Sequence, residues 1–146
     1  MQRACFRLRV DPAHLSEYRA RHAAVWPDML EALKETGWDN YSLFLSPDGW
    51  LIGYVEARDD YASIQRRMDL TEVNARWQAE MSRLFDGLDG AAPDRSFELI
   101  PEIFHLEDQL AAAQSVRYDE TIHESIQTTD AGGEVDHDTK GARNVD

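Results

Sequence analysis

Apolar and polar residues alternate along residues 2–10, at the start of the chain. Successive side chains of a strand point to opposite faces of a sheet, so this alternation is typical of a strand with one buried face. The chain is therefore predicted to begin with a strand. Its buried face is expected to carry Ala4, Phe6, Leu8 and Val10, and its other face mainly Arg3, Arg7 and Arg9.

A helical pattern follows this strand. Asp11 supplies a capping carboxylate, and Pro12 fits the first position of a helix. The pattern ends at Gly37, a residue typical of helix C-termini. Pro27 lies inside it and removes one backbone donor, so we expect this proline to kink or divide the helix. The recurring positions are Leu15, Tyr18, His22, Val25, Trp26, Met29 and Leu33.

Five further elements are predicted beyond this helix. Pro47, Asp48 and Gly49 form a strong turn signal that joins two strands into a hairpin. Pro101 cannot donate to a sheet ladder and marks the last strand as an edge strand or a bulged one. The elements are strands over residues 40–46 and 50–57, helices over 60–67 and 72–85, and a strand over 97–106.

The order of these elements is β-α-β-β-α-β, the ferredoxin-like arrangement within the α+β class. Helices cover only one face of such a four-stranded sheet, yet the strands carry apolar residues on both faces. In residues 50–57, Leu51 and Val55 fall on one face, and Ile52 and Tyr54 on the other. A second copy packed sheet on sheet would cover the outer face. We therefore predict a βαββαβ sandwich of the dimeric α/β-barrel type, present as a homodimer.

The end of the chain differs in composition from the rest. Residues 107–146 carry 10 acidic and 3 basic side chains, and Tyr118 is their one aromatic residue. Such a segment buries too little apolar surface to offset the entropy of ordering it. We predict a domain over residues 1–108 and an acidic tail over 109–146. The tail is expected to be disordered beyond about Thr128, with a short helix over 107–118 as an option.

Composition also limits the partners and the location of the protein. The net charge of −13 argues against nucleic acids and anionic membranes, which both favour a basic face. A single cysteine excludes a disulfide framework and a cysteine-based zinc site. No apolar run reaches the ~20 residues of a membrane span, and no secretory signal is visible. A soluble cytoplasmic protein is expected.

Few residues offer chemistry. The sequence contains no HExxH motif, no glycine-rich phosphate loop and no GxSxG motif, so neither a metal nor another cofactor is predicted. Tyr18 and His22 are four residues apart and share a helix face, with Trp26 one turn further. Histidine can give or take a proton at neutral pH. From the residues alone, His22 is either such a proton-transfer group or a half-exposed histidine without a role.

The aromatic residues also allow two interpretations. Tyr41 and Trp77 could be ordinary core residues, as could the other tryptophans. They could instead form a platform on which a sugar stacks, because an aromatic face suits the C–H faces of a sugar ring.

Four motifs, in order along residues 1–106, resemble the L-rhamnose mutarotase family. The first is Y-x-x-x-H-x-x-x-W-P, formed here by residues 18–27. The segment NYSLFL at residues 40–45 is similar to the family's second strand. Arg76 and Trp77, followed by Met81, match part of its R/K-W-W-x-x-M segment, and the EIFHL sequence at 102–106 resembles its E-V-F-x-L ending.

The resemblance implies a small cytoplasmic enzyme of ferredoxin-like fold that is dimeric and needs no metal or nucleotide. It would interconvert the α and β anomers of L-rhamnose or a related L-sugar. His22 matches the family's proton donor, and Tyr18, Tyr41 and Trp77 match its sugar-binding positions. Gln78 replaces the family's second tryptophan and offers hydrogen bonds where a stacking surface stood. We expect protonated His22 to donate to the ring oxygen of the sugar.

Two other function classes stay open. Ferredoxin-like dimers also serve as cofactor-less monooxygenases of aromatic substrates, in which the same histidine and tryptophan would line an apolar pocket. A non-catalytic protein that binds a small ligand is the third reading, because a fold alone does not fix function. Oxygen consumption would favour the second class, and saturable binding without turnover the third.

Overall fold

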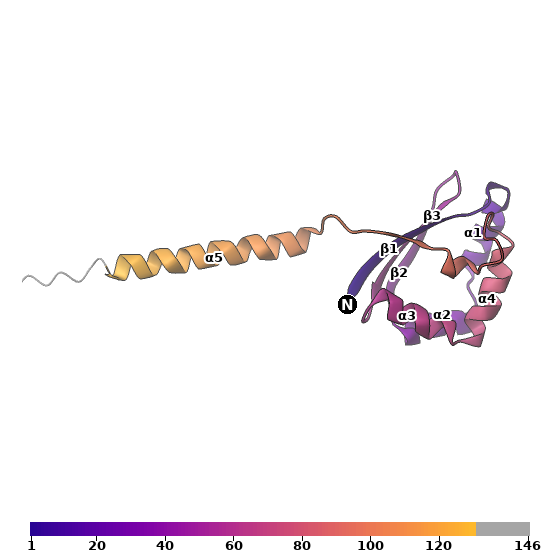
Figure 1. The fold of residues 1–146 in the computed structure, drawn as a ribbon, viewed down its shortest axis with the longest axis horizontal. Helices are drawn as coiled ribbons and strands as arrows, with labels where there is room; N and C mark the ends of the chain where they lie inside the picture. The colour runs from indigo at the N-terminus through magenta and orange to yellow at the C-terminus, as the bar shows by residue number, and fades with distance from the viewer. Residues whose placement is uncertain (131–146) are drawn as a thin grey trace, which may run out of the picture. The chain divides into compact units, whose positions relative to one another are not determined.

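Four antiparallel strands form one sheet in the order β2-β3-β1-β4 (Figure 1). The computed structural model describes residues 1–130, and these strands belong to a first unit, Met1–Ile103. This strand order with intervening helices confirms the predicted α+β, ferredoxin-like fold. The strands are β1 (Gln2–Arg9), β2 (Trp38–Leu45), β3 (Trp50–Ala57) and β4 (Glu98–Ile100).

Helices cover one face of this sheet (Figure 1). Along β3, every second residue is buried, and these residues face the helices. The outer face carries Ile52 and Tyr54, both half-buried, as the sequence pattern predicted. The helices are α1 (Leu15–Ala23), α2 (Pro27–Thr36), α3 (Tyr61–Asp69) and α4 (Glu72–Ser82), with short 3₁₀ turns η1 (Pro12–His14) and η2 (Pro93–Arg95).

Phe6 lies at the centre of the core and is fully buried. Its ring stacks on that of Phe97, with 4.0 Å between the ring centroids. The ring also lies directly over Gly53 of β3, where an added Cβ would come within 2.1 Å of the Phe6 Cζ. A glycine in the middle of a strand usually weakens it, but here it makes room for the aromatic ring.

Pro27 divides the predicted long helix into α1 and α2. It occupies the first turn of α2, where a missing N–H costs nothing. The Trp26 carbonyl accepts a hydrogen bond from the amide of Leu30 at 3.1 Å, which starts the new helix. Gly37 ends α2 in the left-handed conformation, as its position after the pattern predicted.

The start of β2 contains a bulge. The pairing register with β3 shifts between Asp39 and Ser42, and Asn40 has a left-handed φ of 45°. Asparagine tolerates this conformation better than most residues. In a regular strand, Trp38 and Tyr41 would point to opposite faces, whereas here both line the same cavity.

Several predicted boundaries were wrong. The last strand was expected over residues 97–106, but β4 ends at Ile100, directly before Pro101, whose nitrogen cannot continue the ladder. Helix α4 was expected to reach residue 85 and ends at Ser82. Phe85 instead forms an isolated bridge with Val10 that closes the end of the sheet.

A second unit begins at Phe104 and contains α5 (Leu106–Asp130). This helix is much longer than the expected 107–118, and its residues 106–127 are exposed. Alanine has the highest helix propensity, and residues 111–113 are all alanine. Acidic Glu107 and Asp108 in the first turn also favour a helix start. The expected disorder beyond Thr128 falls largely on residues 131–146, which lie outside the described residues.

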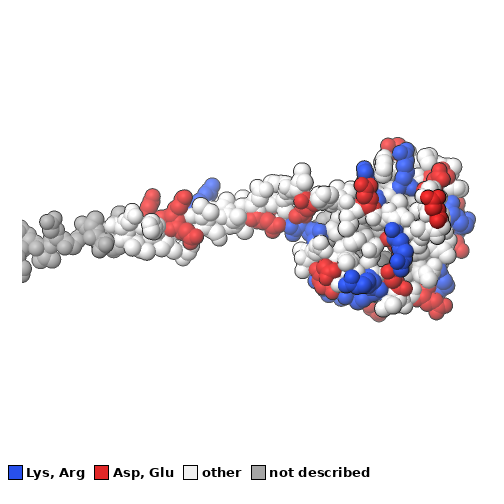
Figure 2. All heavy atoms as spheres, viewed as in Figure 1, with Lys and Arg blue, Asp and Glu red and all other residues white. Residues whose placement is uncertain are grey.

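Charged side chains of both signs lie next to each other on the visible face of the first unit (Figure 2). Ion pairs join several charged residues of this unit, such as Asp39 with Arg58 at 3.0 Å and Asp59 with Arg67 at 2.8 Å. Through residue 130, the chain contains no helix that is both long enough and apolar enough to cross a membrane.

Candidate functional site

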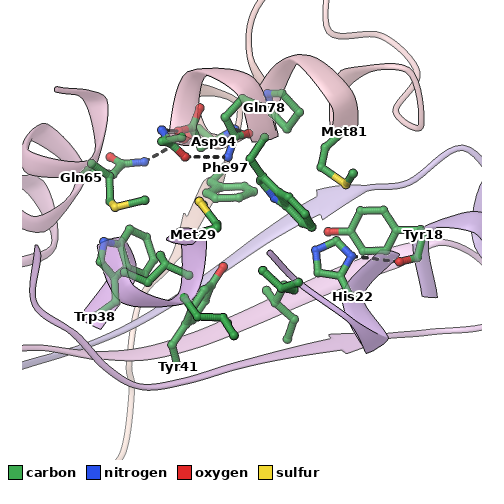
Figure 3. Close-up of a pocket in the computed structure, with 18 of the residues that line it drawn as sticks. Tyr18, His22, Met29, Trp38, Tyr41, Gln65, Gln78, Met81, Asp94 and Phe97 are labelled. Carbon is green, nitrogen blue, oxygen red and sulfur yellow. Dashed lines mark hydrogen bonds between the residues drawn. The ribbon is translucent and has the colours of Figure 1, made fainter. Parts of the chain in front are cut away.

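A cavity of about 310 Å³ lies between the helices and the sheet of the first unit (Figure 3). Its volume is at the lower end of the roughly 300–1,000 Å³ of small-ligand pockets, which suits a molecule of monosaccharide size. The walls are largely apolar and aromatic, with a few polar groups among them. All five residues predicted from the sequence line this cavity: Tyr18, His22, Tyr41, Trp77 and Gln78.

His22 comes from the last turn of α1 and is held between two aromatic rings. Its ring stacks on that of Tyr18, with 4.1 Å between the centroids and 25° between the planes. Trp77 of α4 meets the His22 ring at a steep angle of 83°, with 5.4 Å between the centroids. The i, i+4 spacing therefore brings Tyr18 and His22 together as expected, and Trp77 of α4 contacts the His22 ring as well.

A backbone hydrogen bond fixes the tautomer of His22. Its Nδ1 lies 2.9 Å from the carbonyl oxygen of Tyr18, and a carbonyl can only accept, so Nδ1 carries a proton. Burial lowers the pKa of His22, and the bond to the Tyr18 carbonyl opposes this only in part. The neutral ring then has its lone pair on Nε2, the nitrogen that the Tyr18 carbonyl does not engage.

Tyr18 and Tyr41 place phenol groups at the cavity. Burial raises the pKa of Tyr18. The pKa of Tyr41 is well above its ordinary value, through burial first and then through the charges that Tyr18, Tyr61 and Asp94 would carry. Both phenols therefore stay protonated at neutral pH, and each can donate as well as accept a hydrogen bond.

Trp77 forms an aromatic wall rather than an exposed platform. Only 6% of its surface is accessible, and its ring meets that of Trp26 at 5.1 Å between the centroids. Arg76 lies over the outer side of Trp26, 5.6 Å from the ring centroid, and pairs with Asp28 at 3.1 Å. These contacts fix Trp26, directly before α2, against Trp77 of α4.

Gln78 uses both ends of its amide inside the protein. Its Nε2 donates to Asn74 Oδ1 at 3.1 Å, and its Oε1 accepts from the backbone amide of Asp94 at 3.2 Å. The sequence predicted that Gln78 would offer hydrogen bonds at the site. In the structure the bond to Asp94 ties α4 to the η2 turn, and the bond to Asn74 lies within α4.

Asn74 and Asp94 line the cavity and were missed by the sequence analysis. Asn74 lies three residues before Trp77 and seven before Met81, on the buried face of α4, and is itself buried. A polar residue in an apolar helical register was the signal that could have identified it. Asp94 follows Pro93 in a loop without periodicity, so no pattern pointed to it.

Among residues 1–130, no group of three or more His, Cys, Asp or Glu side chains is arranged to hold a metal ion. The chemistry that the described cavity offers is proton transfer and hydrogen bonding among aromatic walls.

Comparisons with known proteins find similarity to L-rhamnose mutarotases. The sequence profile of L-rhamnose mutarotase matches residues 3–106. An L-rhamnose mutarotase of Burkholderia ambifaria is 36% identical over 108 residues, covering 73% of this chain and all of that protein. One from Acidiphilium cryptum is 33% identical over 107 residues, covering 73% of this chain and 99% of that protein.

A solved structure supports the same fold. The L-rhamnose mutarotase of Formosa agariphila superimposes with a TM-score of 0.58 at 21% identity, covering 73% of this chain and 99% of that one. The profile match spans most of the chain, and it includes every one of the five predicted site residues. The chain belongs to the L-rhamnose mutarotase family.

Proposed function

We propose that this protein interconverts the α and β anomers of L-rhamnose or a related L-sugar. The observation that carries the proposal is the placement of His22, with one nitrogen anchored to a carbonyl, in a cavity of monosaccharide size. Membership of the L-rhamnose mutarotase family supports the reaction class. The sequence resemblance implies a cytoplasmic enzyme, and we propose the same location for this protein.

The reaction needs only one mobile proton. His22 Nε2 takes the proton of the anomeric hydroxyl as the bond between C1 and the ring oxygen breaks and the C1 aldehyde forms. The imidazolium then returns this proton to the released ring oxygen, which is bonded to C1 in the closed sugar. Rotation about C1–C2 exposes the other aldehyde face, and the same steps in reverse close the ring.

The starting state of His22 in this mechanism is neutral. The sequence resemblance suggested that His22 begins protonated and donates to the ring oxygen. Burial favours the neutral ring, and the Tyr18 carbonyl favours the tautomer with a free Nε2. His22 would therefore accept first and donate second.

The substrate would be held by the other predicted residues. The phenols of Tyr18 and Tyr41 would hydrogen-bond to sugar oxygens, and the ring of Trp77 would pack against the sugar's C–H groups. Tyr18 also supports His22 through ring stacking and through its carbonyl. Gln78 would act through its neighbours, because both ends of its amide are bonded to the protein.

The activity is expected to decrease in acid. Below the lowered pKa of His22, Nε2 becomes protonated and can no longer accept the anomeric proton, so kcat/KM should fall. Titration of the His22 ring by NMR, beside a rate profile corrected for uncatalysed mutarotation, checks this. The ring should titrate below 6.5, its ordinary pKa. A higher pKa, or a rate that increases on acidification, would contradict the neutral starting state.

Saturation-transfer NMR tests the function itself. Wild-type protein should accelerate exchange between the α and β C1 protons of L-rhamnose at anomeric equilibrium. L-Fucose, L-lyxose and L-mannose would then define the sugar preference. The family match argues against a monooxygenase or a non-catalytic binder. Oxygen uptake, or binding of L-rhamnose without anomer exchange, would favour one of these instead.

We also propose a homodimer through the outer face of the sheet. This face exposes 62% of Phe44 and 37% of Ile100 beside half-buried Ile52 and Tyr54. An exposed apolar surface of this kind is typical of an interface. The pair of Arg7 with Glu98, at 2.8 Å, lies in the same row as Phe44 and Ile52 and would flank the contact.

Phe44→Glu is expected to convert the dimer to a monomer, because two carboxylates would be buried against apolar partners. Light scattering coupled to size-exclusion chromatography measures the mass directly. Leu70→Glu is the matched control, since Leu70 is 87% exposed at the end of a helix and should leave the mass unchanged. Wild-type protein that runs as a monomer at micromolar concentration would refute the proposal.

We propose, in addition, that residues 1–108 are the mutarotase domain and residues 109–146 an extension without a part in the site. The predicted site residues lie between Tyr18 and Gln78, and the cavity lining reaches no further than Phe97. Running the NMR assay on residues 1–108 beside the full chain tests this, with equal rates expected.

A further inference from the structure

One carboxylate lines the cavity, and neither the sequence motifs nor the mechanism above uses it. Asp94 belongs to the η2 turn, and it is the single acidic residue among the described residues that line the pocket. Figure 3 shows Asp94 beside Gln78, beneath α4, and apart from His22 and Tyr18. The cavity thus has a proton-transfer end at His22 and an acidic end at Asp94.

Two helices hold Asp94 in place by side-chain amides. Asn74 Nδ2 of α4 donates to the carboxylate Oδ2 of Asp94 at 3.0 Å. Gln65 Nε2 of α3 donates to the Asp94 carbonyl at 2.7 Å, and Gln78 accepts from its backbone amide. These bonds position the turn and engage Oδ2 of the carboxylate, and none of them engages Oδ1.

Placing this carboxylate in the cavity costs free energy unless hydrogen-bond donors satisfy it. Burial raises the pKa of Asp94, because a charged group loses hydration, and the bond from Asn74 offsets this only in part. A partly buried charge needs hydrogen-bond donors. The neighbouring Arg95 pairs with Asp69 at 3.2 Å, and its charge also lowers the pKa of Asp94, but burial still prevails. Hydroxyl groups of a sugar are donors of the kind that Asp94 needs.

Asp94 and Tyr41 line the same cavity, so a sugar bound there can meet both groups. The charge of Asp94 also contributes to the raised pKa of Tyr41, after burial, Tyr18 and Tyr61. A sugar there could donate to Asp94 at one end and lose its anomeric proton to His22 at the other.

We propose that Asp94 is a sugar-binding residue that selects the substrate: its carboxylate accepts hydrogen bonds from ring hydroxyls at the end of the cavity away from His22. Asn74 and Gln78 are positioning residues that act through Asp94. The inference rests on the proposed mutarotase function and adds an acceptor for hydroxyls other than the anomeric one. Gln78 then influences sugar choice by fixing the η2 turn and without touching the sugar.

Asp94→Asn tests this role, since the amide oxygen can still accept from Asn74 while the charge is lost. For L-rhamnose, KM is expected to rise about tenfold or more, because hydrogen bonds to a charged acceptor are strong. Asp69→Asn is the matched control, because it removes a carboxylate beside the same turn but outside the cavity, and its KM should stay within about twofold of wild type.

Deoxy sugars separate direct binding from a structural role. The 2-, 3- and 4-deoxy analogues of L-rhamnose keep the anomeric hydroxyl and the ring oxygen, so each can still be assayed. The analogue that lacks the hydroxyl bound by Asp94 should have the same KM with wild type and with Asp94→Asn. If Asp94→Asn raised KM by the same factor with all three deoxy analogues, Asp94 would have a structural role and the proposal would be overturned. An unchanged KM for L-rhamnose in Asp94→Asn would overturn it as well.

Calorimetry of L-rhamnose binding separates the test of Asp94 from the test of mutarotase activity. Wild-type protein that binds L-rhamnose without exchanging its anomers refutes the proposed function, and the loss of affinity in Asp94→Asn still decides the role of Asp94. Wild-type protein that binds no L-rhamnose overturns both.

Discussion

His22→Ala is expected to slow the exchange of L-rhamnose anomers at least tenfold while leaving the protein folded. General acid–base catalysis typically contributes ~10²- to 10⁴-fold, and His22 is the one group in the proposed mechanism that both takes and returns the proton. No neighbour offers the same chemistry, because burial keeps the phenols of Tyr18 and Tyr41 protonated at neutral pH.

Saturation-transfer NMR gives the rate, and circular dichroism reports the fold. His14→Ala is a suitable control: it removes a half-exposed histidine whose nearest ion-pair partner is Glu17 at 4.0 Å, and it should keep full activity. His22→Gln should be as slow as His22→Ala while filling more of the space beside Tyr18 and Trp77. Near-normal exchange in either His22 variant would remove this residue from the mechanism.

Phe6→Ala is expected to produce the largest loss of stability, about 3–5 kcal/mol of unfolding free energy. Phe6 is fully buried and contacts three other aromatic rings, with Phe97 at 4.0 Å between centroids and Tyr41 and Tyr61 at 6.2 and 6.1 Å. A cavity at this point removes the common support of the sheet centre and of Tyr41 in the site.

Urea unfolding measures this loss, with Phe104→Ala as the matched control. Phe104 is 59% exposed, so the same truncation there should cost under about 0.5 kcal/mol. Gly53→Ala provides a second check, because its Cβ would collide with the Phe6 ring. It should destabilise the wild type and cost clearly less in the Phe6→Ala background. Additive effects of the two substitutions would contradict the described contact.

The sequence predicted the elements whose signals are local. Alternation in β1 and β3, the Pro27 break and the capping residues Asp11 and Gly37 all produce the structures that their chemistry favours. His22 and Tyr18 were placed together because helix geometry fixes residues four apart. Their shared cavity with Trp77 and Tyr41 depended on the family resemblance, since nothing local brings α1, α4 and β2 together.

Features that depend on tertiary context were not predictable from the pattern. The hydrogen bonds that position Asp94 come from side chains of α3 and α4. Asp94 itself lies in the η2 turn, and such a segment carries no periodic signal in the sequence. The length of β4 depends on where β1 offers a partner, and Pro101 stops it early. For α5, composition predicted disorder, whereas the alanine run favours helix through intrinsic propensity, which needs no core.

The bulge at Asn40 keeps Trp38 and Tyr41 on the same face of the sheet although they are three residues apart. If β2 paired regularly with β3 at its present length, the two rings would lie on opposite faces and would lose their contact of 4.8 Å between centroids. Removing the bulged residue would instead leave both rings on the cavity side, two positions apart in a regular strand. Removing a residue between Tyr41 and Leu45 would turn part of the strand over, because alternate side chains point to opposite faces. Engineering of this enzyme should therefore change the length of β2 only at the bulge.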